Sequence, residues 1–213
     1  MALSTYYLFG GIYNLIFQNV LIAPSWFARS LGIAVNLLDA PLMLMFLTFF
    51  STSPAMKKRI TWGICIFFAF EAIVLLLDGF SVNAVRVILG PDIVIIIALS
   101  FLFFQRNVRL AITNSKSLGK AFMTSSVLLF YTIFTVVYVF YWLIKNLQYR
   151  KDAELVYYLV SILSALLMSA GIIIENKRIK KLDELKNTRK ELATIYGKTA
   201  GLNKDSRFVK TGY

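Results

Sequence analysis

Long apolar runs separated by short polar links dominate the pattern of this chain. Each run is roughly 18 to 24 residues long, and about 20 apolar residues are what a helix needs to cross a bilayer. Six such runs can be traced, so the pattern predicts an all-α polytopic membrane protein with six transmembrane helices. Their predicted bounds are 6–24, 31–50, 60–77, 84–104, 121–144 and 155–174.

The polar links differ in charge in a regular way. The links after the second and fourth runs, 51–59 and the predicted polar loop 105–120, are basic, whereas the other links carry few Lys or Arg residues. Because cytoplasmic links are enriched in Lys and Arg, this alternation places both termini in the cytoplasm. Trp26, Trp62 and Trp142 fall at the predicted membrane interfaces, where indole rings are enriched. The predicted location is a cell membrane, which in a bacterium is the inner, cytoplasmic membrane.

The C-terminal part of the chain changes from apolar to basic. Residues 176–196 keep good helix formers and are predicted to extend the last membrane helix into the cytoplasm, where their Lys and Arg residues meet anionic headgroups. Residues 197–213 are predicted to be a disordered tail. The expected organisation is therefore a bundle over 1–175, a basic helix over 176–196 and the tail.

Composition narrows the classes of function. Hydrophobic residues make up 58% and charged residues 16% of the chain, which leaves no room for a separate soluble domain of ordinary size. The net charge of +12 is concentrated in links and tail, so nucleic acid is not an expected partner. The chain has no histidine, which excludes His-ligated haem, His-zinc hydrolase sites and His general bases. No cofactor is predicted, and the single Cys65 permits no intramolecular disulfide.

Carboxylates inside the apolar runs are the informative exceptions. Asp39 lies with Asn36 in the second run, Glu71 in the third and Asp92 in the fourth, and a charge at such a position is costly unless it faces protein or water. Asp78 lies seven residues after Glu71, which places the two on nearly one helical face, about 10 Å apart along the axis.

These acids are predicted to share one depth in the membrane. At 1.5 Å per residue, Asp39 and Asp92 lie about 13 Å and Glu71 about 12 Å from the predicted outer ends of their spans. Neutral polar groups fall within about one turn of that level. The predicted ligand- or ion-binding residues are Asp39, Glu71, Asp92, Asn36, Gln18, Asp78, Tyr138 and Ser161, with Ser164 nearby.

Two of the acids lie beside a proline, in Asp39-Ala40-Pro41 and in Pro91-Asp92. Interrupted helices at matching depth are typical of transporter binding sites, so Pro41 and Pro91 are predicted hinges. No Lys or Arg lies at that depth, so the acids must be protonated, share protons or hold a cation. The alternative is that they are neutral carboxyls that only tie helices together.

Three function classes stay open. The favoured one is a small transporter or channel that handles protons, a cation or a small amine-bearing ligand. The second is a receptor or sensor that passes a signal through the last helix to a cytoplasmic partner. The third is a lipid-modifying enzyme, in which carboxylates hold a metal with substrate phosphates, although an enzyme is the less favoured reading. The lipid bilayer is the expected environment, and a homo-oligomer stays open.

Overall fold

A computed structural model describes residues 2–51, 53–114, 117–142 and 147–205, and this part of the chain contains helices and no strand. The all-helical prediction is therefore confirmed. Within these described residues, five helical stretches are long and apolar enough to cross a membrane, as expected of a multi-pass membrane protein. The elements are α1 (Ala2–Phe17), α2 (Ser25–Leu47), a 3-10 turn η1 (Thr48–Phe50), α3 (Pro54–Asp78), α4 (Val82–Asn114), α5 (Leu118–Trp142) and α6 (Leu147–Asp205).

The first helix is shorter than the apolar run that contains it. α1 has 16 residues and ends at Phe17, whereas the sequence predicts a helix to Pro24. Asn19 adopts a positive φ of 59°, a left-handed conformation that a short polar side chain tolerates and that ends a helix. The chain then turns, and α2 begins at Ser25 directly after Pro24.

The predicted polar loop over 105–120 is wrong. α4 continues to Asn114 and α5 begins at Leu118, so most of this segment is helical. Its Gln, Arg, Leu and Ala residues are good helix formers, and a helix that has left the apolar layer keeps its backbone bonds while its side chains become polar. Polarity alone therefore did not indicate a loop.

Neither proline interrupts its helix. α2 runs through Pro41 and α4 through Pro91, and the prediction of two broken helices is not met. Each proline still removes one main-chain donor, so the carbonyls of Leu37 and Val87, four residues earlier, lack their usual partner. A role for either proline as a hinge stays a prediction.

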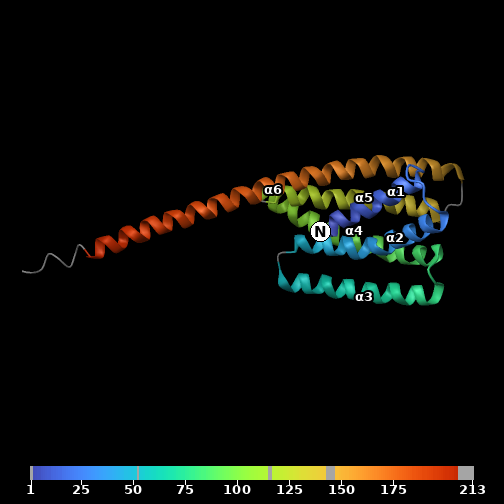
Figure 1. Ribbon diagram of the computed structural model, residues 1–213, viewed down its shortest axis with the longest axis horizontal. Coiled ribbons are helices and arrows are strands. Elements are labelled where there is room, and N and C mark those ends of the chain that lie inside the picture. Colours follow the sequence, from blue (N-terminus) through green and yellow to red (C-terminus); the bar gives the residue numbers. More distant parts are fainter. Residues whose placement is uncertain (1, 52, 115–116, 143–146, 206–213) are drawn as a thin grey trace, which may run out of the picture.

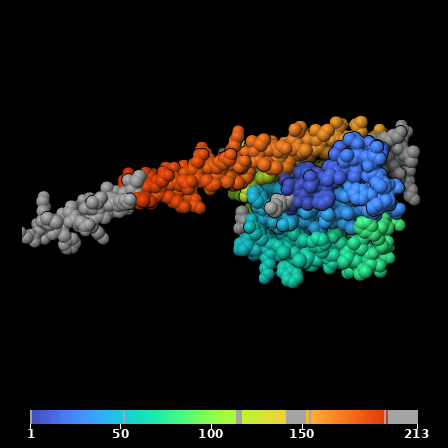
Figure 2. All heavy atoms as spheres, viewed as in Figure 1, coloured from blue at the N-terminus to red at the C-terminus, as the bar shows by residue number. Residues whose placement is uncertain are grey.

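The helices form a bundle with α3 and α6 at opposite edges (Figure 1). α5 packs most extensively, on α6 along one side and on α4 along the other, while α1 packs on α2. α3 makes fewer contacts, to α2 and α4. The C-terminal half of α6 leaves the bundle as a single projecting helix (Figures 1 and 2). α6 continues through Gly197, where the sequence predicts the disordered tail to begin, to Asp205.

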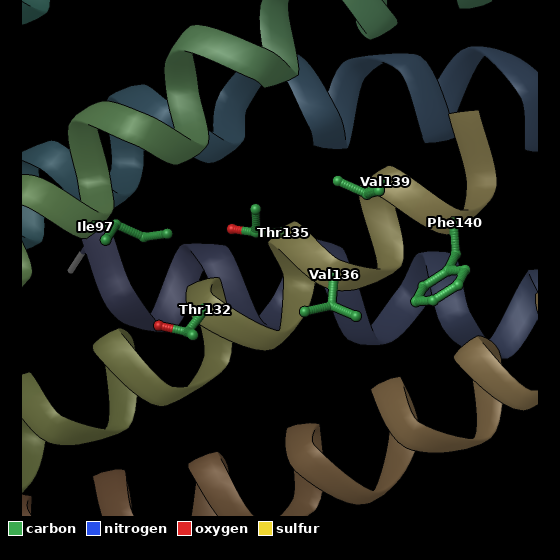
Figure 3. A pocket seen from close by; sticks show the side chains of 6 residues that line it. All are labelled: Ile97, Thr132, Thr135, Val136, Val139 and Phe140. Atoms are coloured by element: carbon green, nitrogen blue, oxygen red, sulfur yellow. The ribbon is translucent and has the colours of Figure 1, made fainter. Parts of the chain in front are cut away.

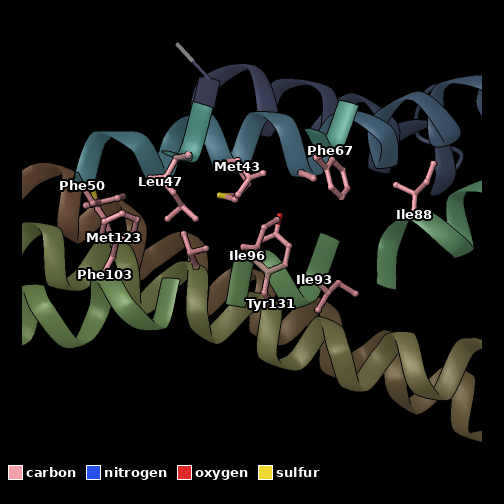
Figure 4. Close-up of a cluster of buried hydrophobic side chains, with 14 of the residues drawn as sticks. Met43, Leu47, Phe50, Phe67, Ile88, Ile93, Ile96, Phe103, Met123 and Tyr131 are labelled. Atoms are coloured by element: carbon pink, nitrogen blue, oxygen red, sulfur yellow. The ribbon is translucent and has the colours of Figure 1, made fainter. Parts of the chain in front are cut away.

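A buried apolar core joins α2, α4 and α5 (Figure 4). Leu47 and Ile96 are fully buried, and Phe50 stacks at a tilt on Phe103 with ring centroids 6.2 Å apart. The core therefore runs along the bundle, from Phe50 just after α2 to Ile88 near the start of α4. Its labelled members are Met43, Leu47, Phe50, Phe67, Ile88, Ile93, Ile96, Phe103, Met123 and Tyr131.

α5 and α6 approach each other most closely at two glycines. A Cβ atom built on Gly119 would lie 2.8 Å from the Gly171 carbonyl oxygen, and one on Gly171 would lie 2.8 Å from the Gly119 carbonyl oxygen. Farther along, the Ser126 hydroxyl donates to the Ser164 carbonyl at 2.7 Å and the Ser164 hydroxyl donates to the Ser126 carbonyl at 3.1 Å. These two pairs hold the helices together.

Ser161, Ala165 and Ser169 lie at four-residue spacing in the sequence, which predicts a stripe of small residues that packs α6 against a neighbouring helix. In the structure Ser169 is exposed, and the close contacts are made instead by Ser164 and Gly171. Both sets have the spacing of one helical face, so spacing alone could not choose between them.

Candidate functional site

A cavity of about 730 Å³ lies among α1, α2, α5, α6 and the first turns of α4. Arg29 and Val82 line it near the beginnings of α2 and α4, and Met43 and Met168 line it deeper in the bundle. Four residues that the sequence assigned to a site line this cavity, namely Asn36, Asp39, Tyr138 and Ser161.

Asp39 is the acidic residue of the cavity wall. Its side chain is 7% exposed, and its Oδ1 atom accepts a hydrogen bond of 2.8 Å from the hydroxyl of Tyr131. The donor comes from α5 and the acceptor from α2, so this bond links two helices across the deep part of the cavity. Tyr6 of α1 also interacts electrostatically with Asp39, which brings a third helix to the same carboxyl.

The other two predicted acids lie behind Asp39 and do not line the cavity. Asp92 of α4 is fully buried and interacts electrostatically with both Asp39 and Glu71 of α3. Both carboxyl oxygens of Asp92 and Oε1 of Glu71 are buried without a hydrogen-bond partner. An ionised carboxylate in such surroundings costs several kcal/mol. The structure thus brings the three acids together, and only one of them reaches the cavity.

No basic side chain is among the groups that interact with Asp39 in the described part of the chain. Arg29 lines the same cavity, but it precedes Asp39 on α2 by ten residues, or about 15 Å along the helix axis. The ion pair between Glu175 and Arg178 lies on α6, well beyond the cavity-lining residues of that helix. The acidic character of the deep end is therefore not neutralised by a protein cation.

Three neutral polar residues of the cavity wall, Asn36, Tyr138 and Ser161, each donate a hydrogen bond to a main-chain carbonyl. The Asn36 amide donates to the Gly32 carbonyl at 2.7 Å, and the Ser161 hydroxyl donates to the Tyr157 carbonyl at 2.7 Å. The Tyr138 hydroxyl donates to the Arg86 carbonyl at 3.0 Å. These bonds hold the three side chains in place along the cavity wall.

Two predicted site residues lie away from the cavity. Gln18 is exposed just after the end of α1, and Asp78 is exposed at the last position of α3. Because α1 ends at Phe17, Gln18 does not lie on the helix along which its predicted depth was counted. Asp78 lies too close to the end of its helix to join the other acids.

The sequence reading missed most of the aromatic lining. Phe130 and Phe134 of α5 stack on each other with centroids 6.0 Å apart, and both contact Tyr157 of α6, at 5.7 and 6.0 Å. We call these three residues the aromatic wall. Tyr131, Phe134 and Tyr138 share a helical face of α5, which was the available signal, but the contribution of α6 was not visible without the fold.

A second cavity of about 420 Å³ is different in character (Figure 3). It is formed by Ile97 of α4 and by residues of α5. Its polar side chains, Thr132 and Thr135, donate to the Leu128 and Tyr131 carbonyls within their own helix. This cavity offers an apolar surface, and none of the predicted site residues lines it.

Among the described residues, no group of three or more Cys, Asp or Glu side chains is arranged to hold a metal ion. No protein-family model, curated protein or solved structure matches the chain.

Proposed function

We propose that this protein is a small membrane transporter or channel whose cavity binds a proton, a cation or a small amine-bearing ligand at Asp39. The observation that carries the proposal is the Asp39 carboxyl in the cavity wall, oriented by Tyr131 and without a basic partner among its interactions. A buried acid without a counter-ion attracts positive charge, and intramembrane acids commonly mark ion and proton pathways.

The positions of the other acids favour movement of charge over simple binding. Asp39 of α2 lines the cavity and interacts with Asp92 of α4. Asp92 in turn interacts with Glu71 of α3, so the three acids form a series over three helices. Such a series can pass protons between helices when the carboxyls change partners. Beyond Met43, buried core residues that include Leu47, Phe50 and Phe103 do not line the cavity, so a transporter would have to separate them in a second conformation.

A receptor or sensor is the second candidate, and α6 favours it. This single helix of 59 residues carries Tyr157 and Ser161 in the cavity and then projects out of the bundle (Figure 1). A shift of its cavity end would be transmitted along a rigid element to a cytoplasmic partner. The proposed topology is six membrane spans with both termini in the cytoplasm, with α1 as the first span.

Flux measurements in proteoliposomes test the proposal. We expect wild-type protein to carry protons, monovalent cations or amines across the bilayer, and Asp39→Asn to abolish that flux. Asp78→Asn is the matched control, because it removes an exposed acid outside the cavity and should leave flux unchanged. Absence of any Asp39-dependent flux or binding would overturn the proposal.

Truncation after Asn176 separates the two candidates. A transporter should keep its flux without the projecting part of α6, because every cavity-lining residue of α6 precedes the cut. A sensor should keep ligand binding after the same truncation and lose its downstream output. Loss of both ligand binding and flux in a folded truncated protein would contradict both candidates.

A further inference from the structure

We infer that the ligand of the cavity is an organic monocation with a bulky apolar body, held by the Asp39 carboxyl and the aromatic wall. This inference rests on the proposed function, since it names the chemical class that the same site would accept. Four features of the cavity lead to it: its size, its aromatic rings, Asp39 as the one acid among the described lining residues, and the positive charge of Arg29.

The size of the cavity favours an organic molecule over a bare metal ion as its ligand. A volume of about 730 Å³ lies within the range of cavities that bind small organic molecules, about 300 to 1,000 Å³. A metal ion such as Ca²⁺ takes about six to eight oxygen ligands from a tight shell. Among the described residues, the cavity wall supplies one carboxylate, and Asp92 and Glu71 lie behind it. The space is therefore suited to a molecule with substantial apolar volume.

The aromatic rings provide the recognition of a diffuse positive charge. Phe130, Phe134 and Tyr157 are each only partly buried in the protein and line the cavity, so their rings contribute surface to it. An organic cation over an aromatic face gains about 0.5 to 2 kcal/mol, more where water is excluded. Tyr6 and Tyr131 bring two further rings to the neighbourhood of the carboxyl. The charge of the ligand would thus lie between Asp39 and aromatic rings.

The charges along the cavity favour a single positive group. Asp39 supplies one negative charge at the deep end, and Arg29 supplies a positive charge toward the other end. A dication whose second charge approached Arg29 would be repelled. A monocation can instead place its apolar body against the intervening side chains, which include Ile33, Val85 and Leu89.

Equilibrium binding of tetraphenylphosphonium to the full-length protein in nanodiscs tests the inference. Tetraphenylborate is the matched control ligand, because it has nearly the same shape and the opposite charge. We expect saturable binding of the cation and none of the anion. Asp39→Asn should weaken cation binding by about tenfold or more, the equivalent of about 1.4 kcal/mol, whereas Asp78→Asn should not change it.

Two substitutions at Tyr157 distinguish the contribution of its aromatic ring to cation binding from that of its hydroxyl. Tyr157→Phe keeps the aromatic face and should bind the cation as wild type does, whereas Tyr157→Leu should weaken binding by about tenfold. Equal binding of both tetraphenyl ions, or equal binding by Tyr157→Leu and Tyr157→Phe, would overturn the inference. If tetraphenylphosphonium does not bind while Asp39-dependent proton or inorganic-cation flux persists, the inference fails and the proposed function stands. If no Asp39-dependent activity of any kind exists, both fail.

Discussion

The hydroxyl of Tyr131 on α5 donates a 2.8 Å hydrogen bond to Oδ1 of Asp39 on α2, and both side chains are buried. The two residues are 92 positions apart in the sequence, so the bond fixes one helix against another. It also gives the carboxyl a fixed direction beside the cavity. The same hydrogen bond therefore contributes to the packing of the bundle and orients the carboxyl that is proposed to bind the ligand.

Removal of the Tyr131 hydroxyl should affect stability directly. Tyr131→Phe leaves a buried carboxyl oxygen without its donor, so we expect a loss of about 1 to 3 kcal/mol in the free energy of unfolding. Tyr138→Phe is the control, because its hydrogen bond to the Arg86 carbonyl is exposed and water can replace it. Denaturant unfolding followed by circular dichroism would compare the two. Equal losses of unfolding free energy in the two variants would show that the Tyr131 hydrogen bond stabilises the fold no more than the Tyr138 hydrogen bond does.

The protonation of the buried acids gives a second prediction. Because both oxygens of Asp92 are buried without hydrogen-bond partners, its ionised form is strongly disfavoured and we expect a protonated carboxyl at neutral pH. Infrared spectra should show a carboxylic-acid band that disappears in Asp92→Asn and persists in Asp78→Asn. A spectrum in which every carboxyl is ionised at neutral pH, with no bound cation, would contradict the account.

The contact of α5 with α6 gives a third prediction. Gly119→Ala or Gly171→Ala would place a methyl group 2.7 to 2.9 Å from atoms of the facing helix, including main-chain atoms that cannot rotate away. Overpacking of this kind costs about 1 to 3 kcal/mol, so both variants should unfold at lower temperature than wild type. Gly63→Ala is the matched control, because nothing lies within 4 Å of its added Cβ and alanine is the better helix former. A thermal midpoint for Gly171→Ala at or above that of Gly63→Ala would refute the close approach.

The sequence predicted the parts of the structure that depend on the length of apolar runs and on the free-energy cost of a charged residue inside such a run. Apolar runs located the main helices because crossing a bilayer demands length and hydrophobicity together. Asp39, Glu71 and Asp92 stood out because acids are rare in such runs, and counting residues along each helix placed them at one depth. The structure does bring these three carboxyls together.

What the sequence missed depends on helix ends and on rotation. The depth of Gln18 required α1 to reach Pro24, and the turn at Asn19 ends the helix first. Which face of α6 packs on α5 depends on the rotation of α6 about its axis, and residue spacing does not determine that rotation. The sequence therefore predicted contacts at Ser161 and Ser169, whereas the structure makes them at Ser164 and Gly171. Tyr157 of α6 was missed for the same reason. Tyr131 shares a helical face with Phe134 and Tyr138, which was a signal, but spacing did not show that this face meets Asp39.

The proposed topology is tested by labelling. In a Cys65→Ala background, a cysteine at Lys57 near the start of α3 should be protected from a membrane-impermeant reagent outside intact cells, and one at Asn83 near the start of α4 should be labelled. Both positions are exposed, so the side of the membrane decides the outcome. Labelling of Lys57→Cys from outside would show that the protein has the opposite orientation in the membrane.

We propose, as the central claim, that the charge of the Asp39 carboxyl is needed for flux or cation binding and that the carboxyl is not needed for the stability of the fold. Its most direct test is the thermal unfolding midpoint of Asp39→Asn, measured on the preparation used for flux or binding. Asparagine keeps the shape and an oxygen that can accept the Tyr131 hydrogen bond, while the cost of a buried charge is removed. We predict an unchanged or higher midpoint together with lost flux or cation binding. A much lower midpoint together with wild-type flux or binding would show that the carboxyl is structural and would contradict the account.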